Sequence, residues 1–145
     1  MRLTIKTTIM CCLLLCCLLA LALTACSRPV DSAVVYADIE QSSVHRTIDA
    51  GTAHQMMADY PDAIVLDVRT NEEYSLEHIA GAKLLSYDEI YSSADTVLSD
   101  KDALILIYCR TGRRSAIAAE ELAQMGYSRV FDFGGIVDWS YGTVP

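Results

Sequence analysis

The most informative segment of the sequence reads Ala103-Leu-Ile-Leu-Ile-Tyr108, then Cys109-Arg110-Thr111-Gly112-Arg113-Arg114-Ser115, then a helical pattern over residues 116–125. An unbroken apolar run of this length predicts a strand buried on both faces, as in a parallel sheet. The helical pattern has one apolar face and ends at Gly126, which is placed as a C-terminal cap. The sequence therefore predicts a buried strand, a turn of polar and basic residues, and a helix.

The remainder of the last hundred residues alternates the same two kinds of pattern. Strands are expected at 44–48, 63–68, 82–85 and 129–133, and helices at 53–58, 72–78, 87–98 and 137–140. Thr70 or Asn71 can cap the helix at 72–78. Alternation of this kind predicts one small α/β domain over residues 44–145, with a mainly parallel central sheet flanked by helices.

The beginning of the chain has a different pattern. Residues 9–25 contain no charge and follow Arg2 and Lys6, which is typical of a secretory signal peptide. An uncleaved membrane span is the alternative, because the stretch approaches the minimum length for one. Leu23-Thr24-Ala25-Cys26 resembles the bacterial lipobox, so we expect a signal peptide at 1–25, a lipid on Cys26 and a tether over 26–43. This expectation places the domain at the bacterial cell membrane, on its extracytoplasmic face.

Charge and cysteine content narrow the function. The chain of 145 residues has a net charge of −8, and loss of residues 1–25 would remove two bases and no acid. Such a domain is not expected to bind nucleic acid or anionic membranes through its charge. Four of the six cysteines lie in the apolar stretch and Cys26 is the expected lipid site, which leaves Cys109. One thiol excludes an intrachain disulfide and a multi-cysteine zinc site, and the three histidines lack ligand spacing for a metal.

Cys109 occupies a favourable place for chemistry. Ligands of parallel sheets bind beyond the carboxyl ends of the strands, where the expected central strand meets Cys109. Gly112 permits a turn whose N–H groups point inward, and the following helix start adds partial positive charge. With Arg110, Arg113 and Arg114 nearby, these features should lower the thiol pKa and receive a small anion. The alternative is a buried structural cysteine beside a solvated basic turn.

At this point the chain resembles a single-domain rhodanese, a thiosulfate sulfurtransferase-like domain, over residues 44–145. The resemblance rests on Asp67-Val68-Arg69, Glu72-Glu73-Tyr74, His78-Ile79-Ala80-Gly81-Ala82, Tyr108 to Ser115, and Gly134-Gly135 followed by Trp139. Ala80 and Ser86 stand where the family often has proline, outside the cysteine turn.

The resemblance implies a two-step sulfur transfer. The Cys109 thiolate takes the outer sulfur of a donor such as thiosulfate, and sulfite leaves. The persulfide is held by the N–H groups of the loop from Arg110 to Ser115, and cyanide, a thiol or a partner protein then accepts the sulfur. No metal or organic cofactor is required. Asp67 and Arg69 either support the loop and the donor or form a structural ion pair.

Two other functions stay open on the sequence alone. Cysteine phosphatases and arsenate reductases place an arginine after a cysteine and five further residues, whereas here that place is Ser115 and Arg114 comes one residue early. A loop one residue shorter favours a single sulfur atom over a phosphoryl group. The second alternative is a non-catalytic module that carries a persulfide or binds a partner.

Overall fold

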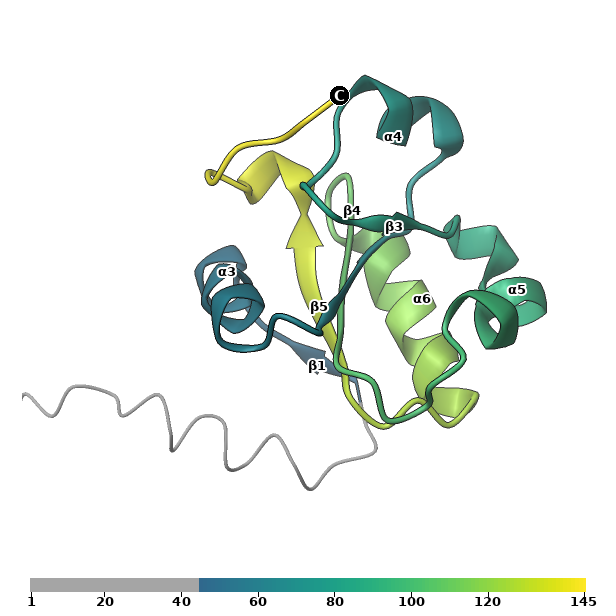
Figure 1. Ribbon diagram of the computed structural model, residues 1–145. Coiled ribbons are helices and arrows are strands. Elements are labelled where there is room, and N and C mark those ends of the chain that lie inside the picture. The colour runs from purple at the N-terminus through teal and green to yellow at the C-terminus, as the bar shows by residue number, and fades with distance from the viewer. Residues whose placement is uncertain (1–44) are drawn as a thin grey trace, which may run out of the picture. The chain divides into compact units, whose positions relative to one another are not determined.

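The computed structural model describes residues 45–145, which form a sheet between helices (Figure 1). The predicted signal at 1–25, the lipid site Cys26 and the tether at 26–43 lie outside the described residues. Within the described range, no helix has the length and apolar character needed to cross a membrane.

Within residues 45–145 the sheet has five strands in the order β1-β5-β4-β2-β3, and every neighbouring pair is parallel. The strands are β1 (Arg46–Thr47), β2 (Ile64–Asp67), β3 (Lys83–Leu84), β4 (Ile105–Cys109) and β5 (Val130–Gly135). All five residues of the central strand β4 are buried. The predicted α/β fold with a mainly parallel sheet is confirmed.

Helices cover both faces of this sheet (Figure 1). α3 (Ala50–Asp59) lies on one face, and α5 (Ile90–Val97) and α6 (Arg113–Gln124) lie on the other. α4 (Asn71–Leu76) follows the carboxyl end of β2, and residues 45–145 also contain two 3-10 turns, η2 (Tyr87–Glu89) and η3 (Ile136–Asp138).

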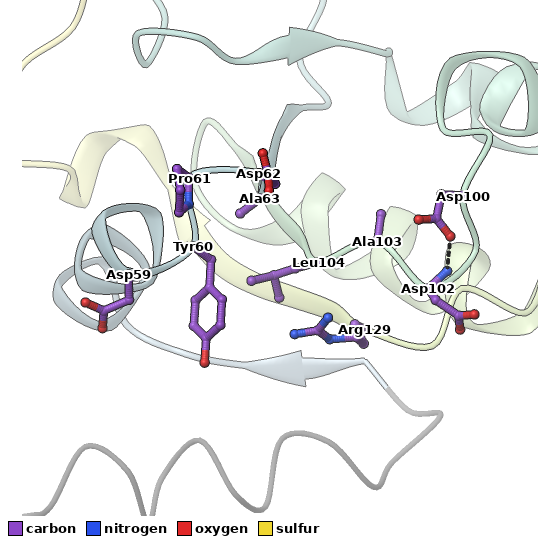
Figure 2. Close-up of a pocket in the computed structure, with 10 residues that line it drawn as sticks. All are labelled: Asp59, Tyr60, Pro61, Asp62, Ala63, Asp100, Asp102, Ala103, Leu104 and Arg129. Atoms are coloured by element: carbon purple, nitrogen blue, oxygen red, sulfur yellow. Dashed lines mark hydrogen bonds between the residues drawn. The ribbon is translucent and has the colours of Figure 1, made fainter.

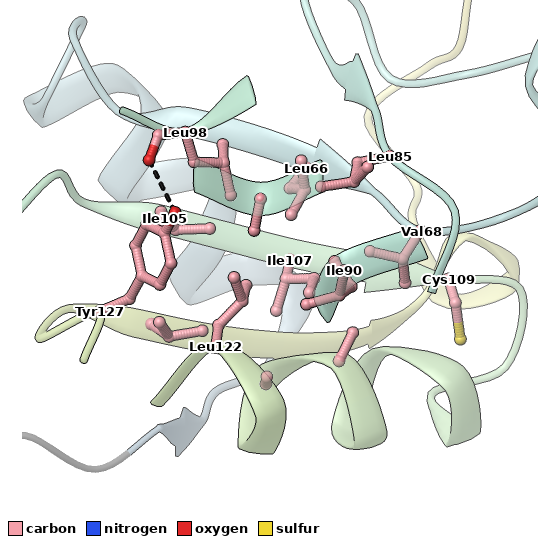
Figure 3. Close-up of a cluster of buried hydrophobic side chains, with 14 residues drawn as sticks. Leu66, Val68, Leu85, Ile90, Leu98, Ile105, Ile107, Cys109, Leu122 and Tyr127 are labelled. Carbon is pink, nitrogen blue, oxygen red and sulfur yellow. Dashed lines mark hydrogen bonds between the residues drawn. The ribbon is translucent and has the colours of Figure 1, made fainter. Parts of the chain in front are cut away.

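Packing of α5 and α6 against the sheet gives the main core, shown in Figure 3. Alternate residues of β2 and β4 point toward these helices, because side chains along a strand alternate between its two faces. Ile105, Ile107 and Cys109 of β4 therefore belong to one cluster. Tyr127, also in this core, donates its hydroxyl proton to the Leu98 carbonyl at 2.7 Å. The cysteine sulfur thus lies at the end of a well-packed layer.

One boundary matters for the site. The helical pattern predicted α6 to begin near residue 116, but the helix begins at Arg113. Gly112 is the N-cap, with φ at +93°, a left-handed conformation that glycine adopts without steric cost. The chain therefore turns into the helix three residues early, and Arg113, Arg114 and Ser115 form the first helical turn.

Candidate active site

Cys109 ends the central strand, at the edge of the sheet where parallel strands finish. Its side chain is 1% exposed and closes one end of the apolar cluster in Figure 3. The pairing of β4 with β5 shifts here, because Ile107 lies opposite Asp132 whereas Cys109 lies opposite Gly135. The irregularity gives β5 one extra residue and brings its glycine pair beside the cysteine turn.

Gly135 lets two backbone segments touch. A Cβ atom at this position would lie 2.5 Å from the Arg110 carbonyl oxygen and 2.8 Å from the Thr111 Cα. Real side chains do not tolerate such contacts with backbone atoms. The glycine therefore fixes how closely β5 supports the turn after Cys109.

The turn folds around the cysteine sulfur. The Gly112 N–H donates to Sγ at 3.1 Å. Burial acts to raise the pKa of the Cys109 thiol, but hydrogen bonds from the Ser115 hydroxyl and from the N–H groups of Ser115, Thr111 and Gly112 together lower it. Since these donors interact best with a charged sulfur, they favour the thiolate, the reactive form.

Ser115 is buried beneath the turn. Its hydroxyl lies 3.0 Å from the carbonyl oxygen of Gly112 and 3.2 Å from that of Gly134. One hydroxyl proton cannot serve both carbonyls and the sulfur at once. Ser115 can therefore turn its proton toward the sulfur as negative charge develops there.

Arg114 is paired with an acid. Its guanidinium donates to both carboxylate oxygens of Glu73, at 2.6 and 2.7 Å. These bonds raise the pKa of Arg114, and the nearby Cys109 sulfur adds a smaller contribution of the same sign. The same bonds, with a further one from the Thr70 N–H, lower the pKa of Glu73 to about 2. Arg114 is therefore paired with Glu73 while remaining near the cysteine sulfur, and its contact with a donor anion stays a prediction.

The other two loop arginines differ in their surroundings. Both Arg110 and Arg113 are exposed. Arg110 lines a cavity of about 360 Å³ beside the cysteine turn, together with Arg69, Glu73, Leu76, Glu77, Ile136 and Val137. Arg113 does not line this cavity. Of the two, Arg110 is the better placed to meet a ligand there.

Asp67 and Arg69 form a buried pair behind this cavity. The Arg69 Nη2 atom lies 2.6 Å from the Asp67 Oδ2 atom, and both side chains are at most 4% exposed. Arg69 also donates to the Glu77 carbonyl at 2.6 Å. The Arg69 guanidinium also lies over the ring of Tyr108, 5.6 Å from its centre. The hydroxyl of Tyr108 accepts a hydrogen bond from the Ile79 N–H at 3.1 Å, and burial raises the pKa of Tyr108 far above its usual value. The geometry agrees with the structural interpretation of the pair, which braces the segment at Glu77.

A second cavity, of about 370 Å³, lies at the opposite end of the sheet (Figure 2). Its lining includes Asp62, Asp100, Asp102 and Arg129, next to the amino ends of β2, β4 and β5. It has no thiol, so the nucleophile and this cavity lie at different ends of the molecule. Across residues 45–145, no group of three or more metal-ligating side chains is clustered.

Sequence reasoning missed the contacts that two residues, Glu73 and Gly135, make with the cysteine turn. Thr70 and Glu73 have the spacing of a capping box, and both reciprocal hydrogen bonds are present. That spacing predicts the helix start but not the second bond of Glu73 to Arg114, since the two residues are 41 positions apart. Gly135 was noticed only as part of a resemblance, and its contact with the turn depends on the bulge in β5.

Comparison with known proteins agrees with this geometry. The Rhodanese-like domain model matches residues 49–141, so the chain belongs to the rhodanese-like family. Thiosulfate sulfurtransferase PspE of Escherichia coli (strain K12) is 38% identical over 73 residues, covering 50% of this chain and 70% of that protein. A sulfurtransferase of Allochromatium vinosum is 35% identical over 99 residues, covering 68% and 91%. The protein is thus a rhodanese-like sulfurtransferase.

Solved structures give the same family. A rhodanese with anions from Escherichia coli is 35% identical, with a TM-score of 0.53, over 57% of this chain and 96% of that one. A rhodanese-related protein from Thermoplasma volcanium is 30% identical, with a TM-score of 0.60, over 68% and 97%.

Proposed function

We propose that the protein transfers a sulfane sulfur from a donor such as thiosulfate to a thiophilic acceptor through a persulfide on Cys109. The observation that carries the proposal is the sulfur of Cys109 at the end of β4, with the Gly112 N–H 3.1 Å away and the thiol pKa lowered. Two relatives support it, one named a thiosulfate sulfurtransferase and one a sulfurtransferase. The Escherichia coli rhodanese described with anions supports an anionic donor.

The reaction balances without a cofactor. The Cys109 thiolate attacks the outer sulfur of thiosulfate, the sulfur–sulfur bond of the donor breaks, and sulfite leaves with the bonding electrons. The outer sulfur of the persulfide is then negative and lies among the N–H groups that favoured the thiolate. An acceptor nucleophile attacks that outer sulfur, and the electron pair of the broken bond returns to Cys109.

A mass measurement tests the first step. Incubation with thiosulfate should add one sulfur, about 32 Da, to the intact protein, and cyanide should remove it. Cys109→Ser should show no gain and should reduce thiocyanate formation to the uncatalysed level. Thiocyanate production that persists in this variant would contradict the proposal. The matched control is Ser128→Ala, which changes an exposed hydroxyl pair with Asp102 at the other end of the sheet.

The mass measurement and two further activity assays separate the alternatives. A stable mass gain without turnover by cyanide or thiols indicates a module that carries persulfide or binds a partner. Hydrolysis of an aryl phosphate that requires Cys109 indicates a phosphatase, and reduction of arsenate an arsenate reductase.

We also propose that residues 1–25 are a signal peptide and that a lipid on Cys26 anchors the protein to the outer face of a bacterial cell membrane. The support is the uncharged stretch at 9–25 and the Leu23-Thr24-Ala25-Cys26 motif. Labelled fatty acid should enter the wild type and a Cys16→Ala control, and should not enter Cys26→Ala. Equal labelling of all three would assign the lipid elsewhere.

A further inference from the structure

The cavity beside the cysteine turn is larger and has more apolar and charged side chains than binding of an inorganic sulfur donor requires. Its volume of about 360 Å³ falls in the range of sites for organic ligands. Two apolar side chains at its border are strongly exposed, Leu76 at 79% and Val137 at 62%. These come from α4 and η3, which lie far apart in sequence. Thiosulfate or cyanide gains nothing from hydrocarbon walls of this kind.

Some of the charged side chains around the cavity are already in ion pairs, and others can bind a ligand. Arg69 is bound to Asp67, and Glu73 is bound to the guanidinium of Arg114. Within residues 45–145, the guanidinium of Arg110 has no ion pair or hydrogen bond. Arg110 follows Cys109 in the chain, so its backbone belongs to the turn that surrounds the reacting sulfur while its side chain lines the cavity.

Glu77 supplies the opposite charge. Its carboxylate is exposed and accepts one hydrogen bond, from the Thr143 hydroxyl at 3.1 Å. Its backbone is held firmly, because its carbonyl accepts from Arg69 at 2.6 Å. Among the described residues, the cavity therefore offers one unpaired cation, Arg110, one carboxylate with spare acceptor capacity, Glu77, and the apolar side chains of its lining.

We infer that this cavity binds the non-reacting part of a low-molecular-weight thiol of amino-acid type, with its carboxylate on Arg110 and its ammonium on Glu77. The inference rests on the proposed sulfur transfer and names the class of acceptor. The outer sulfur of the persulfide would lie about 2 Å from Sγ. The acceptor thiol releases its proton to solvent, its sulfur attacks the outer sulfur, and the electron pair of the broken bond stays on Cys109. The products are the Cys109 thiolate and an organic persulfide.

Four thiols test the two charge contacts separately. Cysteine carries both charges, 3-mercaptopropionate the carboxylate, cysteamine the ammonium, and 2-mercaptoethanol neither. The full-length protein is loaded with sulfur first, and the rate of discharge is then measured in a single turnover, so that donor binding does not enter. Each variant is compared with wild type on the same thiol, which cancels the differences in intrinsic thiol reactivity.

Each variant should slow discharge only by the two thiols that carry the charge which the replaced residue would bind. Arg110→Gln should slow discharge by cysteine and 3-mercaptopropionate about tenfold relative to the two thiols without a carboxylate. Glu77→Gln should slow discharge by cysteine and cysteamine, by a similar or smaller factor. Lys83→Gln and Glu89→Gln remove exposed charges that do not line the cavity, and should leave all four ratios unchanged.

Cyanide separates failure of this inference from failure of the sulfur transfer itself. If cyanide discharges every variant normally and both variants slow all four thiols equally, the thiol subsite is wrong and sulfur transfer stands. If cyanide fails to discharge the wild-type persulfide, sulfur transfer is wrong and the subsite falls with it. The inference is upheld by charge-selective losses beside normal cyanide rates.

Discussion

The neighbouring strands β2 and β4 are each followed by a turn that leads into a helix. The two turns differ in which groups accept hydrogen bonds from their backbone N–H groups. After β2, the Thr70 side chain caps α4, and the Arg69 N–H donates to the Asp67 carboxylate at 2.9 Å. After β4, Gly112 begins α6 with no side-chain cap. The first N–H groups of a helix need acceptors. Side chains satisfy them at β2, whereas at β4 the cysteine sulfur takes that place.

The two strand–turn–helix units share one architecture, but the polar groups of the β4 unit surround a reactive thiol. Both turns lie at the same edge of the sheet, and β2 pairs directly with β4. In the β2 turn, the Asp67 and Thr70 side chains accept hydrogen bonds from nearby backbone N–H groups and so stabilise the turn itself. The β4 turn leaves its N–H groups for a charged sulfur, and depends on its neighbours for support through Glu73 and Gly135.

The largest expected effect on stability comes from the β2 turn. Asp67→Asn removes the charge that neutralises buried Arg69, and breaking such a pair from one side typically costs about 3–5 kcal/mol. Urea unfolding should show this loss, while the exposed control Asp62→Asn should change stability by less than about 0.5 kcal/mol. A loss below about 1 kcal/mol would mean that side-chain charge does not hold this turn.

The next effect tests the backbone support of the β4 turn. Gly135→Ala places a Cβ atom 2.5 Å from the Arg110 carbonyl oxygen, so the turn must move. We expect a loss of about 1–3 kcal/mol from overpacking. Displacement of the nucleophile should lower kcat/KM for sulfur transfer about 10²-fold.

Gly51→Ala is the control for this variant. That glycine lies in α3, where the nearest atoms to an added Cβ belong to side chains. Normal activity in Gly135→Ala would show that the turn does not depend on this close approach.

A smaller effect tests the cap itself. Thr70→Ala removes the hydroxyl that accepts from the Glu73 N–H at 3.3 Å, and should cost about 1 kcal/mol. Thr96→Ala, at an exposed position in α5, should cost less. Thermal unfolding of the two variants compares them directly. Equal unfolding midpoints would show that the Thr70 cap does not stabilise the β2 turn.

The smallest effect concerns the link between the two turns and depends on pH. The pKa of Glu73 is about 2 in the folded protein, against 4.5 for an unperturbed side chain. The ionised form is thus favoured by folding, so its contribution is complete above pH 4.5 and is lost as the pH falls toward 2. Glu73→Gln should destabilise by about 1 kcal/mol or less near neutrality.

This difference between wild type and Glu73→Gln should shrink below pH 4.5. Glu121→Gln on α6 should show no such convergence. In the same variant, removal of a negative charge near Arg114 should lower the pKa of Cys109, which the pH dependence of thiol alkylation measures. An unchanged alkylation profile would show that Glu73 acts on α4 alone.

The sequence predicted the strand–turn–helix units well, because their signals are local. Six apolar residues before Cys109 specify a buried strand, and Gly112 specifies a left-handed residue at the turn. The bond between Glu73 and Arg114 was beyond prediction, since it depends on how closely two adjacent turns approach in space. The early start of α6 was missed because basic residues in a first helical turn give no apolar signal.

Within residues 45–145, both edges of the sheet are strands of two residues, β1 and β3, and each includes a basic side chain, Arg46 or Lys83. An edge of this length offers an incoming chain almost no ladder of free N–H and C=O groups. Association of folded molecules by strand addition is therefore disfavoured, although the sheet interior is strongly apolar. We therefore expect concentrated solutions of the folded domain to show little tendency to form intermolecular sheets.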